Sequence, residues 1–164
     1  MLIGVCFVRS ENEYAYHELC TTLSSVLHGY TQVNFVPRFC ITDHSNAIAK
    51  GVEDAWSGIT ILTCWPHLVR NLKRNMNRLK ENTLDRINVI TSHVYFLHYL
   101  PNKASFVKLA KVALYYWNVS MHECEFATWF ESTYLANDRW SGWYIGASGV
   151  AGIIANNNAL ESAQ

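Results

Sequence analysis

The stretch Phe39–Thr63, FCITDHSNAIAKGVEDAWSGITILT, contains two short apolar runs on either side of a helical pattern. The apolar and β-branched residues predict strands over residues 39–42 and 59–63. Between them, residues 45–56 carry apolar side chains at helical spacing: Ala47, Ile48, Val52 and Ala55. The order strand, helix, strand predicts an α/β alternation.

The flanking sequence extends this pattern in both directions. Residues 1–8 predict a further strand, and Ser10 with Glu13 has the spacing of a capping box for a helix that ends near Gly29. After Pro66 the patterns are helical only, over about 66–79, 84–99, 103–117 and 120–134, followed by a glycine-rich loop over 139–152. We therefore predict one α/β domain, residues 1–64 and 153–164, with an all-helical insertion over residues 65–152.

The composition narrows the class of protein. A chain of 164 residues has the size of one domain, and 50% apolar with 16% charged residues is globular composition. No apolar run approaches the ~20 residues of a membrane span, so no membrane partner is expected. Five scattered cysteines argue against a disulfide framework and for a reducing compartment. The net charge is zero, but six of the 13 Lys and Arg residues lie between Arg70 and Arg86.

Asp43 is the first candidate for chemistry. It stands where the strand over residues 39–42 ends, which is a common position for a metal-binding carboxylate in an α/β sheet. An ordinary helix N-cap or turn aspartate is the alternative interpretation.

Cys64 and His67, separated by two residues, suggest a zinc site. Tetrahedral zinc needs three or four ligands, and the remaining ones would come from His122 and Cys124, or from His93 or His98. Buried cysteines and hydrogen-bonded histidines are commoner than such a site, so zinc is not the expected cofactor.

The basic face after His67 and a group of downstream aromatic residues could both contact nucleic acid. Arg70, Lys73, Arg74 and Arg78 fall on one side of the predicted helix, where they would contact phosphates or form an ordinary solvated face. Trp140, Trp143 and Tyr144 would stack on bases or pack beneath the glycine-rich loop.

Taken in order, several segments resemble Mutator-like (MULE) transposases. Residues 39–49, FCITDHSNAIA, are similar to the TD segment of that family, and residues 64–71, CWPHLVRN, to its C-x-x-H segment. Residues 140–144, WSGWY, and 157–162, NNALES, resemble the tryptophan motif and the final acidic motif. The resemblance spans nearly the whole chain.

This resemblance implies an RNase H-like fold with a helical insertion between the second and third catalytic acids. It implies a DNA strand-transfer enzyme whose three carboxylates hold divalent ions, Mg²⁺ or Mn²⁺. By motif match Asp43 and Glu161 are the second and third of these catalytic, metal-holding acids, and Cys64 and His67 lie beside them. The implied partner is DNA at transposon ends, bound through the Arg70–Arg78 face. The resemblance also implies a nuclear location and is compatible with a homo-oligomer.

The first aspartate of the family pattern has no counterpart, because every acidic residue before Asp43 lies in or at the start of the first helix: Glu11, Glu13 and Glu18. The resemblance therefore implies an incomplete catalytic domain, in which the first strand is missing and which we expect to be inactive alone. The alternative is a non-catalytic DNA-binding or interaction module that keeps the basic helix. A small zinc-binding helical protein is a third hypothesis.

Overall fold

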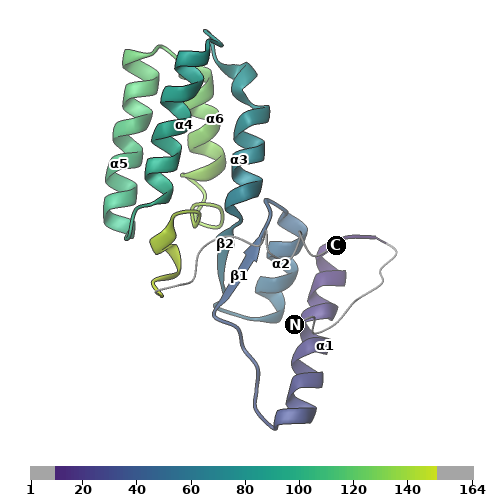
Figure 1. Cartoon of the computed structure of the whole chain (residues 1–164). Helices are drawn as coiled ribbons and strands as arrows, with labels where there is room; N and C mark the ends of the chain where they lie inside the picture. The colour runs from purple at the N-terminus through teal and green to yellow at the C-terminus, as the bar shows by residue number, and fades with distance from the viewer. Residues whose placement is uncertain (1–9, 151–164) are drawn as a thin grey trace.

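The computed structural model describes residues 10–150, which form a small α/β part and a helical bundle (Figure 1). The α/β part consists of α1 (Glu13–Thr31), β1 (Phe39–Thr42), α2 (Asn46–Ala55) and β2 (Thr60–Thr63). The bundle consists of α3 (Trp65–Arg74), α4 (Leu84–His98), α5 (Lys103–Tyr115) and α6 (Cys124–Tyr134). Three short turns accompany these helices: η1 (Met76–Arg78), η2 (Tyr116–Ser120) and η3 (Ile145–Ser148).

The two strands are parallel, as expected when a helix connects them. Phe39 pairs with Thr60 and Thr42 with Thr63, so the strands end side by side. The prediction of a mixed α/β fold is confirmed, and β1 has the predicted bounds. The protein is nevertheless mostly helical, because the described residues contain only this two-stranded sheet. The strand predicted over residues 1–8 lies outside the described residues.

Helix α1 differs from its prediction at both ends. Asn12, and not Ser10, is the N-cap, since its side chain accepts a hydrogen bond from the Ala15 amide at 3.0 Å. The helix continues past Gly29 to Thr31, and Gln32 ends it in a left-handed conformation (φ 57°).

Helix α1 packs closely on α2 at Gly51. A Cβ atom added to Gly51 would lie 2.7 Å from Cβ of Tyr16 and 2.9 Å from the His17 amide nitrogen. Only glycine allows this approach of the two helices. Of the α1 residues, only Cys20 is buried, and the apolar residues Leu19 and Val26 are exposed.

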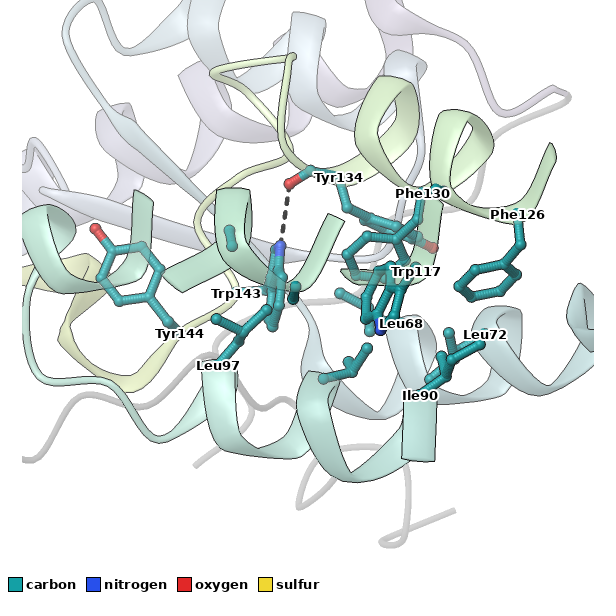
Figure 2. Packing of buried hydrophobic residues seen from close by; sticks show 14 of the residues in the cluster. Leu68, Leu72, Ile90, Leu97, Trp117, Phe126, Phe130, Tyr134, Trp143 and Tyr144 are labelled. Atoms are coloured by element: carbon teal, nitrogen blue, oxygen red, sulfur yellow. Dashed lines mark hydrogen bonds between the residues drawn. The ribbon is translucent and has the colours of Figure 1, made fainter. Parts of the chain in front are cut away.

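The bundle encloses the larger of two hydrophobic cores (Figure 2). Apolar residues at helical spacing along the predicted helix over residues 66–79 are all buried there: Leu68, Leu72, Met76 and Leu79. Aromatic rings from η2 and α6 fill the centre, where Trp117 meets Phe126 and Phe130 edge-on with centroids 5.7 and 5.3 Å apart. Edge-to-face contacts of this kind are favourable beyond the area that they bury.

Residues 139–144 connect the two parts. Thr63 at the end of β2 donates from its amide to the Gly142 carbonyl (3.1 Å) and from its hydroxyl to the Trp140 carbonyl (3.0 Å). Trp140 is buried in the smaller core of the α/β part, with Cys20, Ala49, Val52 and Ile61. Trp143 is buried in the bundle core. The two tryptophans thus anchor one short segment in both cores.

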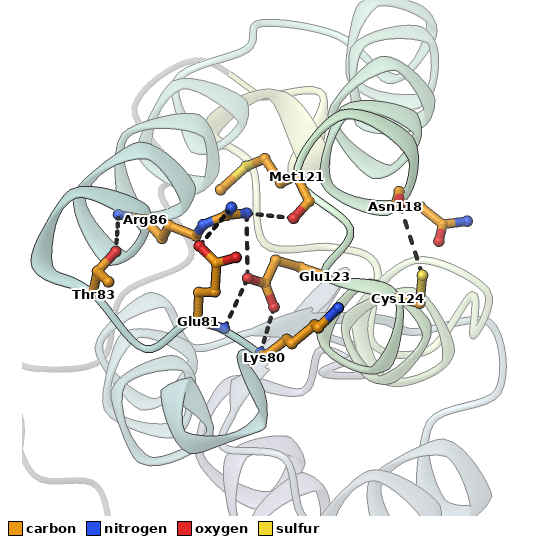
Figure 3. Close-up of polar contacts among 8 residues, drawn as sticks. All are labelled: Lys80, Glu81, Thr83, Arg86, Asn118, Met121, Glu123 and Cys124. Carbon is orange, nitrogen blue, oxygen red and sulfur yellow. Dashed lines mark hydrogen bonds and ion pairs between the residues drawn. The ribbon is translucent and has the colours of Figure 1, made fainter.

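A buried carboxylate ties the start of α6 to the loop after η1 (Figure 3). Glu123 is 1% exposed and accepts hydrogen bonds from the Lys80 amide (2.6 Å) and the Glu81 amide (3.2 Å). Arg86 lies 3.4 Å from the same carboxylate and also contacts Glu81 and the Met121 carbonyl. Glu123 is the N-cap residue of α6, but its side chain makes no capping hydrogen bond there.

Among the residues that the structure describes, none of the helices combines the length and the apolar character needed to cross a bilayer.

Candidate nucleic-acid interface

Asp43 follows β1 directly and is not the N-cap of α2. That role belongs to Ser45, whose hydroxyl accepts a hydrogen bond from the Ile48 amide at 3.4 Å. The Asp43 carbonyl accepts from the Ser45 amide at 2.8 Å, and its carboxylate accepts from the Thr42 hydroxyl at 3.4 Å. The N-cap half of the alternative is therefore wrong, whereas its turn half fits the place of Asp43 in the short connection between β1 and α2. The half-buried Asp43 side chain lines an open pocket beside the strand end.

Helix α3 supplies one wall of this pocket. It starts at the end of β2, after the buried N-cap Cys64 and with Pro66 in its first turn, where proline is well tolerated. His67, Arg70 and Arg74 follow at intervals of three and four residues and therefore share one face. The structure thus brings Asp43, His67 and Arg70 from the two motif segments into one pocket, together with Arg74 of the predicted basic face.

Tyr134 of α6 also lines the pocket and is hydrogen-bonded to α3. The Asn71 side-chain amide donates to the Tyr134 hydroxyl at 2.6 Å, and Asn75 donates to the Asn71 side chain at 3.0 Å. Burial raises the pKa of Tyr134, and the Asn71 hydrogen bond opposes that shift. Tyr134 is therefore a neutral phenol at pH 7, and it links α6 to α3 beside the pocket that it lines.

His44 completes the pocket, with its ring 4.3 Å from Trp140 and 5.3 Å from Tyr134, centroid to centroid. Burial lowers the pKa of His44, while a hydrogen bond with the Thr133 backbone and the charge of Asp43 act in the opposite direction. His44 is thus mainly neutral at pH 7, since the unperturbed value is already about 6.5. Arg70 and Arg74 supply the fixed positive charge.

No family model, curated protein or solved structure matches the chain.

The pocket gathers only part of the predicted basic face. Lys73 is exposed but does not line the pocket. Arg78 lies in η1 outside the pocket lining, where its guanidinium donates to Asn75 at 2.9 Å, pairs with Glu125 at 3.3 Å and stands over the Trp129 ring. Because Arg70 and Arg74 are the residues of this face that line the pocket, they are the better candidates for phosphate contacts. Glu161, the other predicted catalytic acid, lies outside the described residues.

Three of the residues weighed for zinc have other contacts: His93, His98 and Cys124. His93 accepts a hydrogen bond from the Trp117 indole (3.0 Å), and the buried His98 ring bonds the Trp143 carbonyl (2.6 Å) and stacks on Trp65. Cys124 is exposed and its thiol contacts the Asn118 carbonyl at 3.7 Å. Within residues 10–150, no three His, Cys, Asp or Glu side chains are grouped so that they could hold a metal ion.

The aromatic residues weighed for base stacking are buried. Trp140, Trp143 and Tyr144 belong to the two hydrophobic cores, and their exposed fractions are at most 6%. The interpretation as packing residues is correct, and the stacking interpretation is wrong, because none of these rings presents a face to solvent.

Sequence reasoning missed three pocket residues: His44, Asn71 and Tyr134. The first two lie within the motif segments, next to the residues that were singled out. Tyr134 lies in the helical pattern over residues 120–134, and only the folded chain shows that its hydroxyl reaches Asn71.

Proposed function

We propose that this chain belongs to a DNA-processing domain of the Mutator-like transposase type and that the pocket of Asp43, His67, Arg70 and Arg74 faces the DNA backbone. The observation that carries the proposal is that residues from two motif segments, separate in the sequence, meet in one place. Two motif segments, one after β1 and one after β2, contribute to a single open pocket. Each arginine guanidinium is well suited to phosphate, because its N–H donors can bind two phosphate oxygens at once.

The order of elements supports an RNase H-like arrangement. Parallel β1 and β2 are joined by α2, Asp43 stands at the end of β1, and the helical bundle lies between β2 and the segment 139–144 that returns to β2. This is the position at which the resemblance calls for an insertion. The RNase H-like fold is part of this proposal.

The proposal concerns binding of DNA and includes no chemical step. Asp43 is the only carboxylate that lines the pocket among the described residues, and those residues contain no group that could hold a divalent ion. One carboxylate does not make a two-ion site, which needs several oxygen ligands for each ion. The pocket as described therefore fits a phosphate backbone and does not by itself fit Mg²⁺ or Mn²⁺.

Exchanging both pocket arginines for acidic residues tests this proposal. We expect the double variant Arg70→Glu/Arg74→Glu to bind a labelled DNA duplex at least about tenfold more weakly than the unchanged protein. If both side chains contact phosphates, the slope of log affinity against log salt should also fall by roughly 2, since each contact contributes about 0.9. Fluorescence anisotropy over a series of salt concentrations measures both quantities.

The matched control is Lys108→Glu/Lys111→Glu on α5, which changes the net charge by the same amount outside the pocket. This control should bind DNA within about twofold of the unchanged protein and keep its salt slope. Equal loss in the two double variants would mean that only net charge matters, and the assignment of the pocket would then be wrong.

A further inference from the structure

A cleft lies between α5, the outer edge of β2 and the chain that follows α6. Its volume is about 390 Å³, which is in the range of sites for small ligands. The floor is apolar and buried, and it includes Leu62 of β2, Phe106 and Ala110 of α5, and Tyr144. None of its lining residues lines the pocket next to Asp43, so this cleft is a separate candidate site that does not depend on the DNA proposal.

The Tyr144 hydroxyl points to a polar ligand in the cleft. Tyr144 is only 6% exposed, and its ring stacks on Phe106 with centroids 4.2 Å apart. Its hydroxyl has no hydrogen-bond partner among residues 10–150, and Figure 2 shows this hydroxyl directed away from Trp143. Burial raises the pKa of Tyr144, so the hydroxyl is a neutral donor at pH 7. Because the hydroxyl of a buried tyrosine normally finds a partner, an acceptor on a ligand in the cleft would satisfy it.

The outer edge of β2 offers a backbone donor in the same cleft. The Thr60 amide donates to the Arg38 carbonyl at 3.0 Å, on the side of β1. Successive residues of a strand direct their amides to opposite sides, so the amides of Ile61 and Thr63 face away from β1. Thr63 donates to the Gly142 carbonyl, whereas the Ile61 amide has no partner in the described part of the chain. A free amide on a strand edge suits the carbonyl of an extended peptide.

The rim of the cleft carries charges of both signs. Lys103 and Lys111 lie on α5, Glu131 lies on α6, and Asp138 lies in the connection that follows α6. None of these four side chains forms an ion pair with another described residue. A simple anion or a simple cation would be repelled by two of the four charges. A ligand that carries one charge of each sign, at separate ends, would match all of them.

We propose that this cleft binds a short apolar peptide with free ends, of roughly two or three residues. Its carboxylate would pair with the α5 lysines, and its ammonium group with Glu131 and Asp138. Its carbonyls would accept from the Ile61 amide and the Tyr144 hydroxyl, while its side chains cover the apolar floor. A single amino acid fits less well. The rim lysines and carboxylates do not reach one another, so the two charges of the ligand must be several ångströms apart, as they are in an extended peptide.

The dipeptide leucyl-phenylalanine is the probe, titrated into the isotope-labelled full chain and followed by NMR. We expect saturable binding with Kd of roughly 0.1–1 mM and a shift of the Ile61 amide signal. Tyr144→Phe removes only a hydroxyl that has no described partner, so it should leave the urea midpoint almost unchanged yet weaken binding by about threefold or more. Val107→Trp fills the cleft from the exposed side of α5 and should weaken binding at least about tenfold.

Capped dipeptides test the two charged ends separately. The acetylated dipeptide lacks the ammonium group and the amidated dipeptide lacks the carboxylate, and each should bind about threefold or more weakly than the free dipeptide. Lys103→Gln/Lys111→Gln should weaken binding of the free dipeptide and leave that of the amidated one unchanged. Glu131→Gln/Asp138→Asn should likewise weaken binding of the free dipeptide and leave that of the acetylated one unchanged.

Two control variants make the result specific. Val112→Trp places the same side chain at an exposed valine of α5 outside the cleft and should leave binding unchanged. Arg70→Glu/Arg74→Glu should also leave it unchanged, so failure of the cleft and failure of the DNA pocket are separable. The proposal is overturned by absence of saturable binding up to about 10 mM dipeptide, by equal affinity of the free and doubly capped dipeptides, or by indifference to the Tyr144 and Val107 variants.

Discussion

Glu123→Ala is expected to lower the free energy of unfolding by about 3 kcal/mol, the lower end of the range for breaking a buried ion pair. The substitution removes the acceptor of the Lys80 and Glu81 amides and leaves Arg86 without its buried carboxylate. The cost stays at the lower end because Arg86 is 23% exposed and keeps its 2.8 Å pair with Glu81. Urea unfolding followed by circular dichroism measures the loss.

Glu125 supplies the matched control for this prediction. It also pairs with an arginine, Arg78, at 3.3 Å, but its side chain is 72% exposed. Exposed ion pairs contribute about 0–1 kcal/mol, so Glu125→Ala should leave the unfolding midpoint almost unchanged. Equal effects of the two substitutions would contradict the account, because the Glu123 carboxylate is buried and accepts two backbone amide hydrogen bonds, whereas the Glu125 carboxylate is exposed.

Trp143→Ala is expected to destabilise the protein by about 3–5 kcal/mol, the usual cost of removing a large aromatic side chain from a core. Trp143 is fully buried, meets the Phe106 and Phe130 rings edge-on at centroid distances of 4.9 and 5.9 Å, and donates from its indole to the Tyr134 carbonyl (Figure 2). Its removal leaves a cavity where the segment 139–144 enters the bundle. Loss of near-UV circular dichroism at lower urea concentration is the expected signal.

The variant Trp143→Phe distinguishes a packing role of Trp143 from a role in DNA contact. Phenylalanine keeps an aromatic ring but loses the hydrogen bond to the Tyr134 carbonyl, which typically contributes about 1 kcal/mol. The variant should therefore fold, with a smaller loss of stability than Trp143→Ala, and bind DNA as the unchanged protein does. A loss of DNA affinity in this folded variant would revive the interpretation of the tryptophan motif as a base-stacking surface.

Local sequence patterns predicted a helix or strand well where the residues at its own ends set its boundaries. Phe39–Thr42 is an apolar run ended by Asp43, and Ser45 caps α2, so both boundaries are encoded within a few residues. The start of α1 was wrong by two residues, because Ser10 and Asn12 are both good caps and only one of them is used. Such a choice between neighbouring caps depends on small energy differences that a pattern does not resolve.

Contacts between distant segments could not be predicted in the same way. Glu123 has the sequence position of a helix cap, yet its hydrogen bonds go to amides more than 40 residues earlier. Trp140 and Trp143 are three residues apart and belong to different cores. The pocket itself combines a strand end, a helix face and Tyr134 of α6, and the sequence named four of its residues without showing that they meet.

The most direct test of the proposed site is the DNA affinity of Asp43→Asn, measured in EDTA with the duplex used for the arginine variants. If Asp43 shares the pocket with DNA phosphates, its carboxylate repels them, and neutralising it should tighten binding by about two- to tenfold at low salt. Asp54→Asn on α2 makes the same change at an exposed residue outside the pocket and should have no effect. Tighter binding of Asp43→Asn alone would place DNA against the end of β1, whereas unchanged binding would contradict the proposed interface.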